Sequence, residues 1–421
     1  MCLDYNIFMK KPELLLPGGS LEKCEYAVRY GADAVYFGTV DFSLRALRKG
    51  ELITDDNMKV CVDLVHSLGA KAYLTLNIYS FNSDIEKLVS KVDIIKDANP
   101  DGILVSDFGV LSTVKKYLPD IDIHISTQAN TLNSAAVKFW QDLGAKRVVL
   151  ARELSIPEIA QIKRDVPDME LEVFVHGSQC VSFSGRCLLS DYMTNGERKA
   201  NKGGCAQPCR WSYKLLEETR PNEYFEIEQN DRGTHILSPK DLALINYIPQ
   251  LIDAGVDSLK IEGRTKSLYY VSAAARTYRH AIDEWCDKGV QNKEENLNQL
   301  AKIGNRGYTT GFYIEKPDSE GYSYDISKGL AGADFLCMFL AEEDGLIKVL
   351  TKNKFYVGDE IEILTPDEMF TTKVLKVTDY NTKEEKEFSN TNDTSLIEFE
   401  RVPNDIKYAL GRTVGIKNER C

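Results

Sequence analysis

The sequence predicts an α/β fold: a (β/α)8 barrel of the TIM type with a cysteine-rich insertion after strand seven, followed by a small C-terminal β-barrel. Two observations predict the first barrel. Short β-branched runs alternate with amphipathic helical patterns, and eight such runs precede residue 265. A third observation, the change to closely spaced strand patterns after about residue 332, predicts the second barrel.

The expected elements follow one another in a regular order. A strand at 13–17 precedes a helix at 20–31, and a helix at 241–253 precedes the eighth strand at 256–264. The strands between them are expected at 32–38, 70–77, 101–107, 121–127, 145–151 and 171–177. The run 234–242 also has a strand pattern, and we assign it to the insertion at about 177–240.

Helices at 266–285 and 292–303 complete a first domain of residues 1–310. A stretch rich in glycine and tyrosine then predicts a linker at 311–331. Five strand patterns separated by turns place the small β-barrel at 332–421. The 421 residues therefore form two domains.

Four cysteines lie within one short stretch of the insertion, and they are Cys180, Cys187, Cys205 and Cys209. Only Cys205 and Cys209 have the short spacing that structural zinc sites favour. A 4Fe-4S cluster is a wider body, and its thiolate ligands can come from well-separated positions. The spacing therefore favours an iron-sulfur cluster over zinc. Two disulfides and four unconnected thiols are the remaining alternatives.

The charge of the chain is uneven. A net charge of −12 argues against a protein whose whole surface binds nucleic acid. The insertion is locally basic, and its candidate nucleic-acid-binding residues are Arg186, Arg198, Lys199, Lys202, Arg210 and Trp211. Basic side chains neutralise phosphate while aromatic rings stack on unpaired bases, which suits a structured RNA. The alternative is an ordinary solvated loop.

Chemistry in such barrels takes place at the C-terminal ends of the strands. The polar residues expected there are Asn77, Asp107, Gln128, Asn130, Arg152, Glu153, His176, Glu262 and Arg264. Arg152 and Arg264 suit a bidentate clamp on a carboxylate, and His176 is a candidate acid or base. We count Glu262 with them as a candidate catalytic residue. A structural ion pair or a hydrogen-bonded histidine is the alternative at each position.

The sequence lacks the features of exported or membrane proteins. The first residues contain no apolar core of a signal peptide, and no apolar run has the length of a membrane span. Ten cysteines in such a chain indicate a reducing compartment. We therefore expect a cytoplasmic protein that does not contact a membrane.

The stretch EVFVHGSQCVSFSGRCLLS (172–190) resembles the signature of the collagenase-like peptidase family U-32. Further matches are GGCAQPCRWSY, LSPKDL, LKIEGR, NRGYTTGFY (305–313) and the opening ELLLPGGSLEKCEYAVRYGADAVYFG, so the resemblance covers nearly the whole chain. The chain is most similar to the branch that hydroxylates tRNA. That branch implies 5-hydroxylation of the wobble uridine with prephenate or a similar small carboxylate, with the four cysteines as ligands of a 4Fe-4S cluster. The implied partners are the tRNA anticodon loop and, in some members, a related chain of the family.

Whether the chain is a peptidase can be tested by searching it for the residues that proteolysis requires. The chain contains neither H-E-x-x-H nor G-x-S-x-G, and its five histidines lack zinc-ligand spacing. A Cys180–His176 pair is the one conceivable nucleophile and base, but it would leave three cysteines unexplained. The leading hypothesis is thus an iron-sulfur tRNA hydroxylase. The alternatives are a U-32 peptidase and a noncatalytic RNA-binding or assembly subunit.

Overall fold

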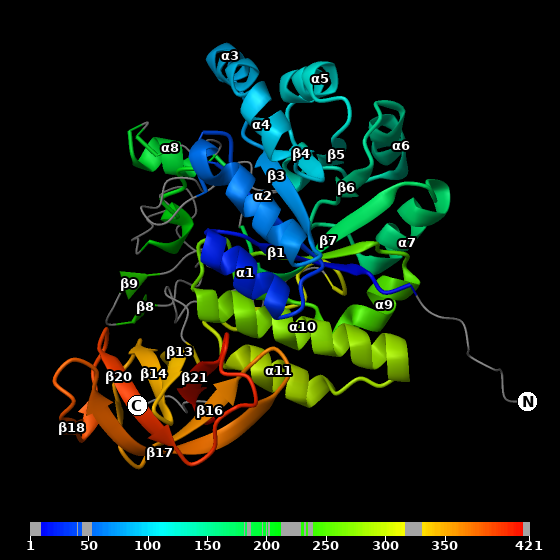
Figure 1. The fold of residues 1–421 in the computed structure, drawn as a ribbon. Helices are drawn as coiled ribbons and strands as arrows, with labels where there is room; N and C mark the ends of the chain where they lie inside the picture. Colours follow the sequence, from blue (N-terminus) through cyan, green and yellow to red (C-terminus); the bar gives the residue numbers. More distant parts are fainter. Residues whose placement is uncertain are drawn as a thin grey trace, which may run out of the picture.

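The computed structural model contains two closed barrels, and two helices of the first domain lie against the second barrel (Figure 1). It describes residues 10–39, 41–43, 53–180, 182, 187–195, 197–198, 200, 203–211, 229–230, 233–234, 239–315 and 331–415. Arg186, Lys199 and Lys202, which the sequence suggests as RNA contacts, lie outside these residues.

The N-terminal domain is the predicted eight-stranded parallel barrel. Its strands are β1 (Glu13–Pro17), β2 (Ala34–Phe37), β3 (Lys71–Leu76), β4 (Gly102–Val105), β5 (Asp122–Ile125), β6 (Arg147–Val149), β7 (Glu170–Ser178) and β11 (Ser258–Ile261). Each strand pairs with the next in parallel, and pairing of β11 with both β1 and β7 closes the barrel. Most strand residues are buried on both faces, which explains their continuous apolar runs.

Helices cover the outside of this barrel (Figure 1). They are α1 (Leu21–Arg29), α2 (Met58–Ser67), α3 (Asn82–Ser90), α4 (Val92–Ala98), α5 (Phe108–Tyr117), α6 (Ser134–Asp142), α7 (Ile156–Asp165), α9 (Ile248–Asp253), α10 (Leu268–Lys288) and α11 (Lys293–Ala301). Several of them begin at a capping side chain: Ser20, for example, accepts a hydrogen bond from Lys23 N at the start of α1.

The segment before the eighth strand differs from its prediction. A helix was expected over 241–253, but β10 (Asp241–Ala243) and a 3-10 turn (Ile245–Tyr247) come first, and α9 occupies only the end of this range. β10 pairs antiparallel with the end of β7 and parallel with β12 (Tyr308–Thr309). Two of its three residues, Asp241 and Leu242, lie within the predicted extra strand at 234–242. The strand pairs with the end of β7 and is not part of the closed eight-stranded sheet.

The C-terminal domain is the predicted small barrel. Its closed sheet contains β13 (Phe335–Glu343), β14 (Leu346–Thr351), β16 (Glu360–Leu364), β17 (Met369–Asp379), β20 (Thr394–Phe399) and β21 (Leu410–Thr413), with β18 (Glu385–Lys386) attached to β17. Five of the six closing strands match predicted patterns. The strand β21 was missed, although its pairing with β13 and β16 completes the barrel.

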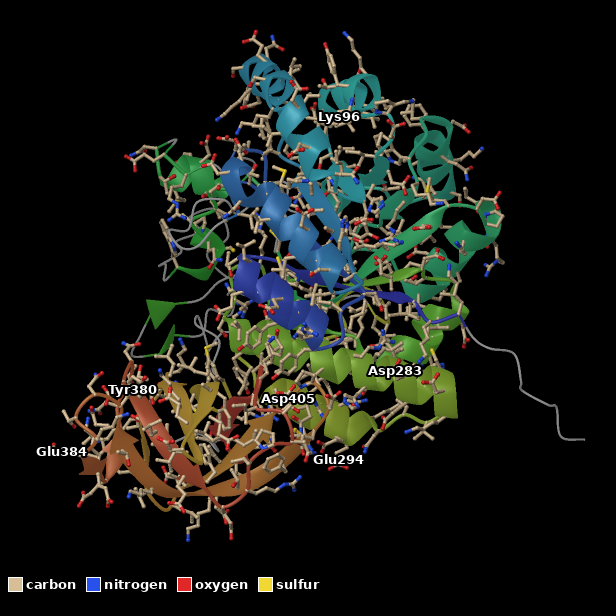
Figure 2. The ribbon with its side chains drawn as sticks, viewed as in Figure 1. Lys96, Asp283, Glu294, Tyr380, Glu384 and Asp405 are labelled. Carbon is tan, nitrogen blue, oxygen red and sulfur yellow. The ribbon has the colours of Figure 1, made fainter. Side chains whose placement is uncertain are left out.

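Polar contacts fix the second domain against α1, α10 and α11. The Tyr30 hydroxyl at the end of α1 lies 2.9 Å from the carbonyl oxygen of Leu364 and 2.7 Å from that of Tyr408. Lys302, after α11, donates two hydrogen bonds of 3.0 Å to Glu362. Residues 331–415 contain 17 Asp or Glu residues and 10 Lys or Arg residues. Exposed acidic residues on this side of the molecule include Glu294, Glu384 and Asp405 (Figure 2). The excess of negative charge makes the second domain poorly suited to binding a polyanion.

Helices in the part of the chain that the structure describes lack the combination of length and apolar character needed to span a bilayer.

Candidate functional site at the barrel mouth

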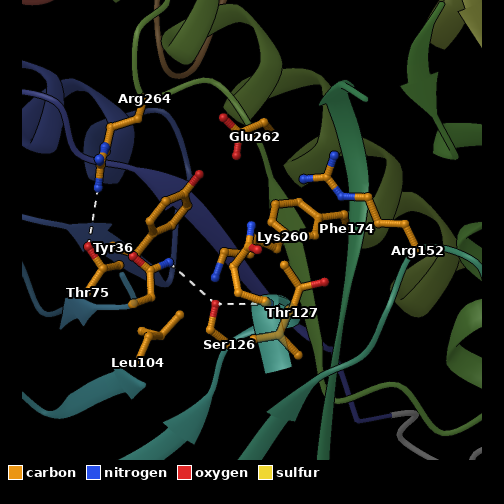
Figure 3. Close-up of a pocket in the computed structure, with 13 residues that line it drawn as sticks. Tyr36, Thr75, Leu104, Ser126, Thr127, Arg152, Phe174, Lys260, Glu262 and Arg264 are labelled. Carbon is orange, nitrogen blue, oxygen red and sulfur yellow. Dashed lines mark hydrogen bonds between the residues drawn. The ribbon is translucent and has the colours of Figure 1, made fainter. Parts of the chain in front are cut away.

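A pocket opens inside the N-terminal barrel at the C-terminal ends of its strands (Figure 3). It contains about 560 Å³ of open space, part of it continuous with solvent. The residues lining it are Tyr36, Thr75, Asn77, Leu104, Ser126, Thr127, Gln128, Val149, Arg152, Phe174, Lys260, Glu262 and Arg264. Three of these side chains are basic and one is acidic, so the pocket is suited to a small anion.

Arg264 follows β11, and its guanidinium points to Thr75 of β3 along one side of the pocket (Figure 3). It donates hydrogen bonds to the hydroxyls of Ser43 and Thr75, the latter at 3.2 Å. The two hydroxyls also contact each other. These contacts hold the arginine in place over the pocket before any ligand binds, as a preorganised anion site requires.

Arg152, beyond the end of β6, lies on the other side of the pocket. Its Cζ atom is 3.9 Å from the centre of the Phe174 ring, a cation-π contact. Its Nη1 donates to the carbonyl oxygen of Ser178 at 3.0 Å. Because Ser178 lies two residues before Cys180, this bond connects the pocket directly to the start of the cysteine-rich insertion.

Lys260 of β11 is a pocket residue that the sequence argument missed. It is 3% exposed, and its Nζ donates to Glu172 Oε1 at 2.7 Å. Burial, partly offset by the Glu172 carboxylate, lowers the pKa of Lys260 below its ordinary value. One signal could have revealed it, since it is the one charged residue in the short buried strand SLKI.

A buried ionic network lies beneath Lys260 at the base of the barrel. Arg147 donates to Glu172 at 3.2 Å and also to Glu13 and Glu170. The Glu13 carboxyl accepts further bonds from Tyr73 and Ser258. Burial alone raises the pKa of Glu13, but Arg147 and these hydrogen bonds lower it overall. The network closes the bottom of the barrel with paired charges rather than apolar side chains.

The structure brings most of the predicted barrel-mouth residues together. Asn77, Gln128, Arg152, Glu262 and Arg264 all line the pocket. The residues Asp107, Asn130 and Glu153 do not line it. Asp107 instead caps α5, accepting a hydrogen bond from Val110 N at 3.0 Å. Asn130 ends a 3-10 turn in the left-handed conformation, with φ of 60°.

His176 is not part of the pocket. Its ring is 1% exposed and packs among Tyr270, Tyr278 and Tyr308 at centroid distances of 5.5 to 5.7 Å. Burial lowers its pKa to about 3, so the ring is neutral at physiological pH. Neither ring nitrogen has a hydrogen-bond partner among the described residues.

A strand irregularity explains the position of His176. Glu172 and Phe174 face the barrel interior, and regular alternation would place residue 176 on the same face. The register between β7 and β11 shifts between Lys260 and Ile261, which re-aims His176 toward the tyrosines of α10 and β12. Gly177 (φ 104°) allows the close approach that follows, since a Cβ there would lie 2.3 Å from the Glu262 carbonyl oxygen.

The four insertion cysteines lie at the surface of the molecule. Cys180 and Cys205 are exposed, whereas Cys187 and Cys209 are half-buried. Cys187 precedes α8 (Leu189–Met193), and Cys209 lies in the 3-10 turn η5 (Pro208–Arg210), which packs against α8. The segments carrying Cys187 and Cys209 are therefore in contact.

Two of the sulfur atoms accept backbone hydrogen bonds in the same way. Leu189 N donates to Cys187 Sγ, and Gln207 N donates to Cys205 Sγ, each at 3.3 Å and each from two residues further along the chain. A neutral thiol is a weak acceptor, whereas a thiolate is the form that binds metal. Backbone donors to sulfur also tune iron-sulfur clusters. This local geometry suits thiolate ligands.

Ser190 links the two cysteine segments. Its buried hydroxyl donates to the Arg198 carbonyl oxygen at 2.7 Å and accepts from Ala206 N at 2.8 Å. Arg198 in turn donates to the carbonyl oxygens of Gly204 and Cys205. Trp211 donates to the Ala206 carbonyl at 3.2 Å. Arg198 and Trp211, suggested by the sequence as RNA contacts, thus support the Cys205 segment.

Within the described residues, no three side chains among His, Cys, Asp and Glu are grouped around a point as a single metal ion requires. A four-iron cluster spreads its thiolates more widely than a single ion does. The thiol donor set and its backbone hydrogen bonds fit such a cluster, with Cys180, Cys187, Cys205 and Cys209 as the residues that would hold it.

Comparison with known proteins identifies relatives along most of the chain. A protein of Haemophilus influenzae named tRNA hydroxylation protein P is 38% identical, over 95% of this chain and 95% of its own. The tRNA hydroxylation protein P1 of Bacillus subtilis is also 38% identical, over 89% and 88%. A Porphyromonas gingivalis protein named collagenase is 34% identical, over 84% and 86%.

Solved structures and family models complete the comparison. The U32 peptidase Mk0906 matches 59% of this chain and 92% of its own, with a TM-score of 0.39 and 14% identity. The model of peptidase family U32 matches residues 19–323, and the model of the U32 C-terminal domain matches residues 332–409. Both domains are therefore accounted for, and the chain belongs to peptidase family U32.

Proposed function

We propose that this protein is a cytoplasmic iron-sulfur enzyme that hydroxylates the wobble uridine of tRNA at position 5, with prephenate or a similar small carboxylate as its second substrate. The observation that carries the proposal is the direct connection between an anion pocket and the cysteine segment, made by the Arg152–Ser178 hydrogen bond. The relatives named for tRNA hydroxylation support the choice of tRNA as substrate.

The pocket supplies the binding chemistry for the acid. Arg264 and Arg152 approach from opposite sides, and each guanidinium can form paired hydrogen bonds with a carboxylate. Asn77 and Gln128 supply neutral polar groups beside them. Because the pocket is partly enclosed, these interactions operate with little competition from water.

The cysteine segment supplies the second half of the site. A cluster held by Cys180, Cys187, Cys205 and Cys209 provides redox or Lewis-acid chemistry when bound. The chain's own contribution is to hold the thiolates in place through Ser190 and the backbone donors to sulfur. The basic residues of the insertion then suit the phosphates of an anticodon loop.

Proteolysis is the second candidate function, favoured by the resemblance to a protein named collagenase. It would need Cys180 as nucleophile and His176 as base. His176 is buried among three tyrosines, and its ring nitrogens bond to none of the described residues, Cys180 included. This geometry favours hydroxylation over proteolysis.

The test is complementation of a bacterial strain that lacks its own tRNA hydroxylation protein. Expression of this chain should restore 5-hydroxyuridine, measured by mass spectrometry of digested tRNA. Cys187→Ala should abolish the restoration and, after anaerobic purification, should lose iron and the visible absorption of the cluster. Cys286→Ala, outside the insertion, is the matched control and should retain both. An unmodified tRNA pool with the wild-type chain would reject the proposal.

A further inference from the structure

The pocket contains a buried amine that the proposed function does not use. Lys260 is the one lysine among the described pocket-lining residues. Its Nζ lies 4.4 Å from the centre of the Tyr36 ring and 5.5 Å from that of Phe174, so it is placed between two aromatic side chains (Figure 3). The Tyr36 hydroxyl is itself fixed by a 3.0 Å hydrogen bond to the Ile261 carbonyl.

The Lys260 amine contacts a proton acceptor, the carboxylate of Glu172. Its Nζ is 2.7 Å from Glu172 Oε1, and Glu172 is fully buried. The other Glu172 oxygen accepts from Arg147 at 3.2 Å, which holds the carboxylate in position. In a medium of low dielectric, transfer of the ammonium proton to the carboxylate replaces the Lys260–Glu172 ion pair by a neutral amine and a neutral carboxyl group, while Arg147 keeps Glu13 and Glu170 as its carboxylate partners. The burial that lowers the pKa of Lys260 favours the same change.

A neutral, desolvated lysine amine is a nucleophile toward carbonyl groups. Lys260 and Arg152 contact the same Phe174 ring, at 5.5 and 3.9 Å. Both side chains also line the same pocket, so a small acid whose carboxylate binds Arg152 lies in the cavity that contains the Lys260 amine. In a 2-oxo acid, the carbon next to the carboxylate is the carbonyl carbon.

We propose that Lys260 forms an imine with a 2-oxo acid bound in this pocket. Glu172 accepts one proton from the ammonium group, and the free amine attacks the carbonyl carbon. The carbonyl oxygen leaves as water with the two remaining amine hydrogens, and the proton on Glu172 returns to the imine nitrogen. No oxidant or reductant is consumed. This inference rests on the proposed function for its acid substrate and adds the covalent step.

The test is chemical trapping on the full-length chain. Cyanoborohydride reduces an imine to a stable secondary amine, so incubation with phenylpyruvate as probe should give one saturable adduct per chain. The adduct should have the mass of the acid minus one oxygen atom and should map to the peptide containing Lys260. Phenyllactate, which carries a hydroxyl in place of the oxo group, should give none.

Two variants localise the reaction. Lys260→Arg keeps the positive charge and the contact with Glu172 but cannot form an imine, so it should lose the adduct. Lys266→Arg, which changes a neighbouring lysine outside the pocket lining, should keep the adduct. No adduct on the wild-type chain, or adducts that persist at wild-type level in Lys260→Arg, would overturn the imine.

The outcomes also separate this inference from the proposed function. An adduct at Lys260 on a chain that leaves tRNA unmodified would support the imine and reject tRNA hydroxylation. Restored 5-hydroxyuridine without any adduct would reject the imine and leave the hydroxylation proposal standing.

Discussion

His176 has a structural role, although its position in the sequence suggested a catalytic one. It lies four residues before the first insertion cysteine, at the end of a barrel strand, yet it packs between three tyrosines. Their hydroxyls donate to backbone carbonyls, as Tyr278 does to Val175 at 2.8 Å. The imidazole is thus an aromatic core residue, which must stay neutral for the core to remain packed.

This position predicts a pH effect on stability. The native pKa of His176 is about 3, against an ordinary value of 6.5. Between these values the unfolded chain binds a proton that the native chain does not, so stability falls as the pH is lowered. The loss attributable to His176 is up to about 1.4 kcal/mol per pH unit.

His176→Phe, which keeps an aromatic ring between the tyrosines, should remove this part of the pH dependence. Urea unfolding at pH 7, 6 and 5 measures it. The difference in free energy of unfolding between variant and wild type should shift in favour of the variant as the pH falls. A difference that stays constant across this range would show that the histidine is accessible to protons in the native state.

At the scale of elements, the cysteine segment depends on contacts between short pieces of chain. Ser190 of α8 bonds both Arg198 and Ala206, so one hydroxyl sets the distance between the segments of Cys187 and Cys205. Removing a hydrogen bond that holds a metal ligand in position typically lowers the metal affinity by about 10 to 100-fold. Ser190 is thus a positioning residue for the proposed cluster.

Ser190→Ala should therefore release iron to a chelator about 10-fold faster than wild type or more. The decay of visible absorption under anaerobic conditions measures this rate. Ser67→Ala, at the exposed end of α2 near the opposite end of the barrel, is the matched control and should release iron at the wild-type rate. Equal rates in Ser190→Ala and wild type would remove Ser190 from the support of the cluster.

The elements also show what sequence patterns can predict. The eight barrel strands were predictable because buried parallel strands have continuous apolar runs. The strand β21 (LGRT) was not, because it has two polar residues and no clear alternation, and only its pairing with β13 and β16 makes it a strand. For the same reason α9 was predicted too long, since β10 forms only by pairing with β7 and β12.

The pocket was predictable in part. Arg152, Glu262 and Arg264 follow strand ends, and the fold alone places such residues at the barrel mouth. The roles of Lys260 and His176 could not be predicted, because they depend on the direction in which each side chain points. The register shift between β7 and β11 turns His176 out of the barrel, and no sequence pattern marks that shift. The insertion cysteines were identifiable from their clustering, whereas the Ser190 contact between their segments required the structure.

At the scale of the whole molecule, the two barrels share a buried polar interface. Arg412 of β21 is fully buried, and it donates to Glu362 of the same domain. It also donates to the Tyr269 hydroxyl of α10 at 3.2 Å and to Gln299 of α11. The strand β21, which the sequence patterns did not reveal, therefore supplies a buried cationic contact between the domains.

Removing this arginine should destabilise the whole chain. Arg412→Ala removes the hydrogen bonds to Glu362, Tyr269 and Gln299 but leaves Lys302 paired with Glu362. Loss of a buried hydrogen bond that involves a charged group typically costs about 1.5–3 kcal/mol. The matched control is Arg401→Ala in the same domain. Arg401 pairs with Glu368 at an exposed site, where such a pair contributes about 0–1 kcal/mol.

Chemical denaturation of both variants measures these effects. Because Arg412 contacts α10 and α11, its loss should also weaken the coupling between the barrels, so that their unfolding transitions separate. A drop of less than about 1 kcal/mol for Arg412→Ala, within the range of a surface pair, would mean that apolar contacts alone hold the domains together. The C-terminal barrel would then be an independently attached unit rather than a fixed support for the helices α10 and α11 that pack on the catalytic barrel.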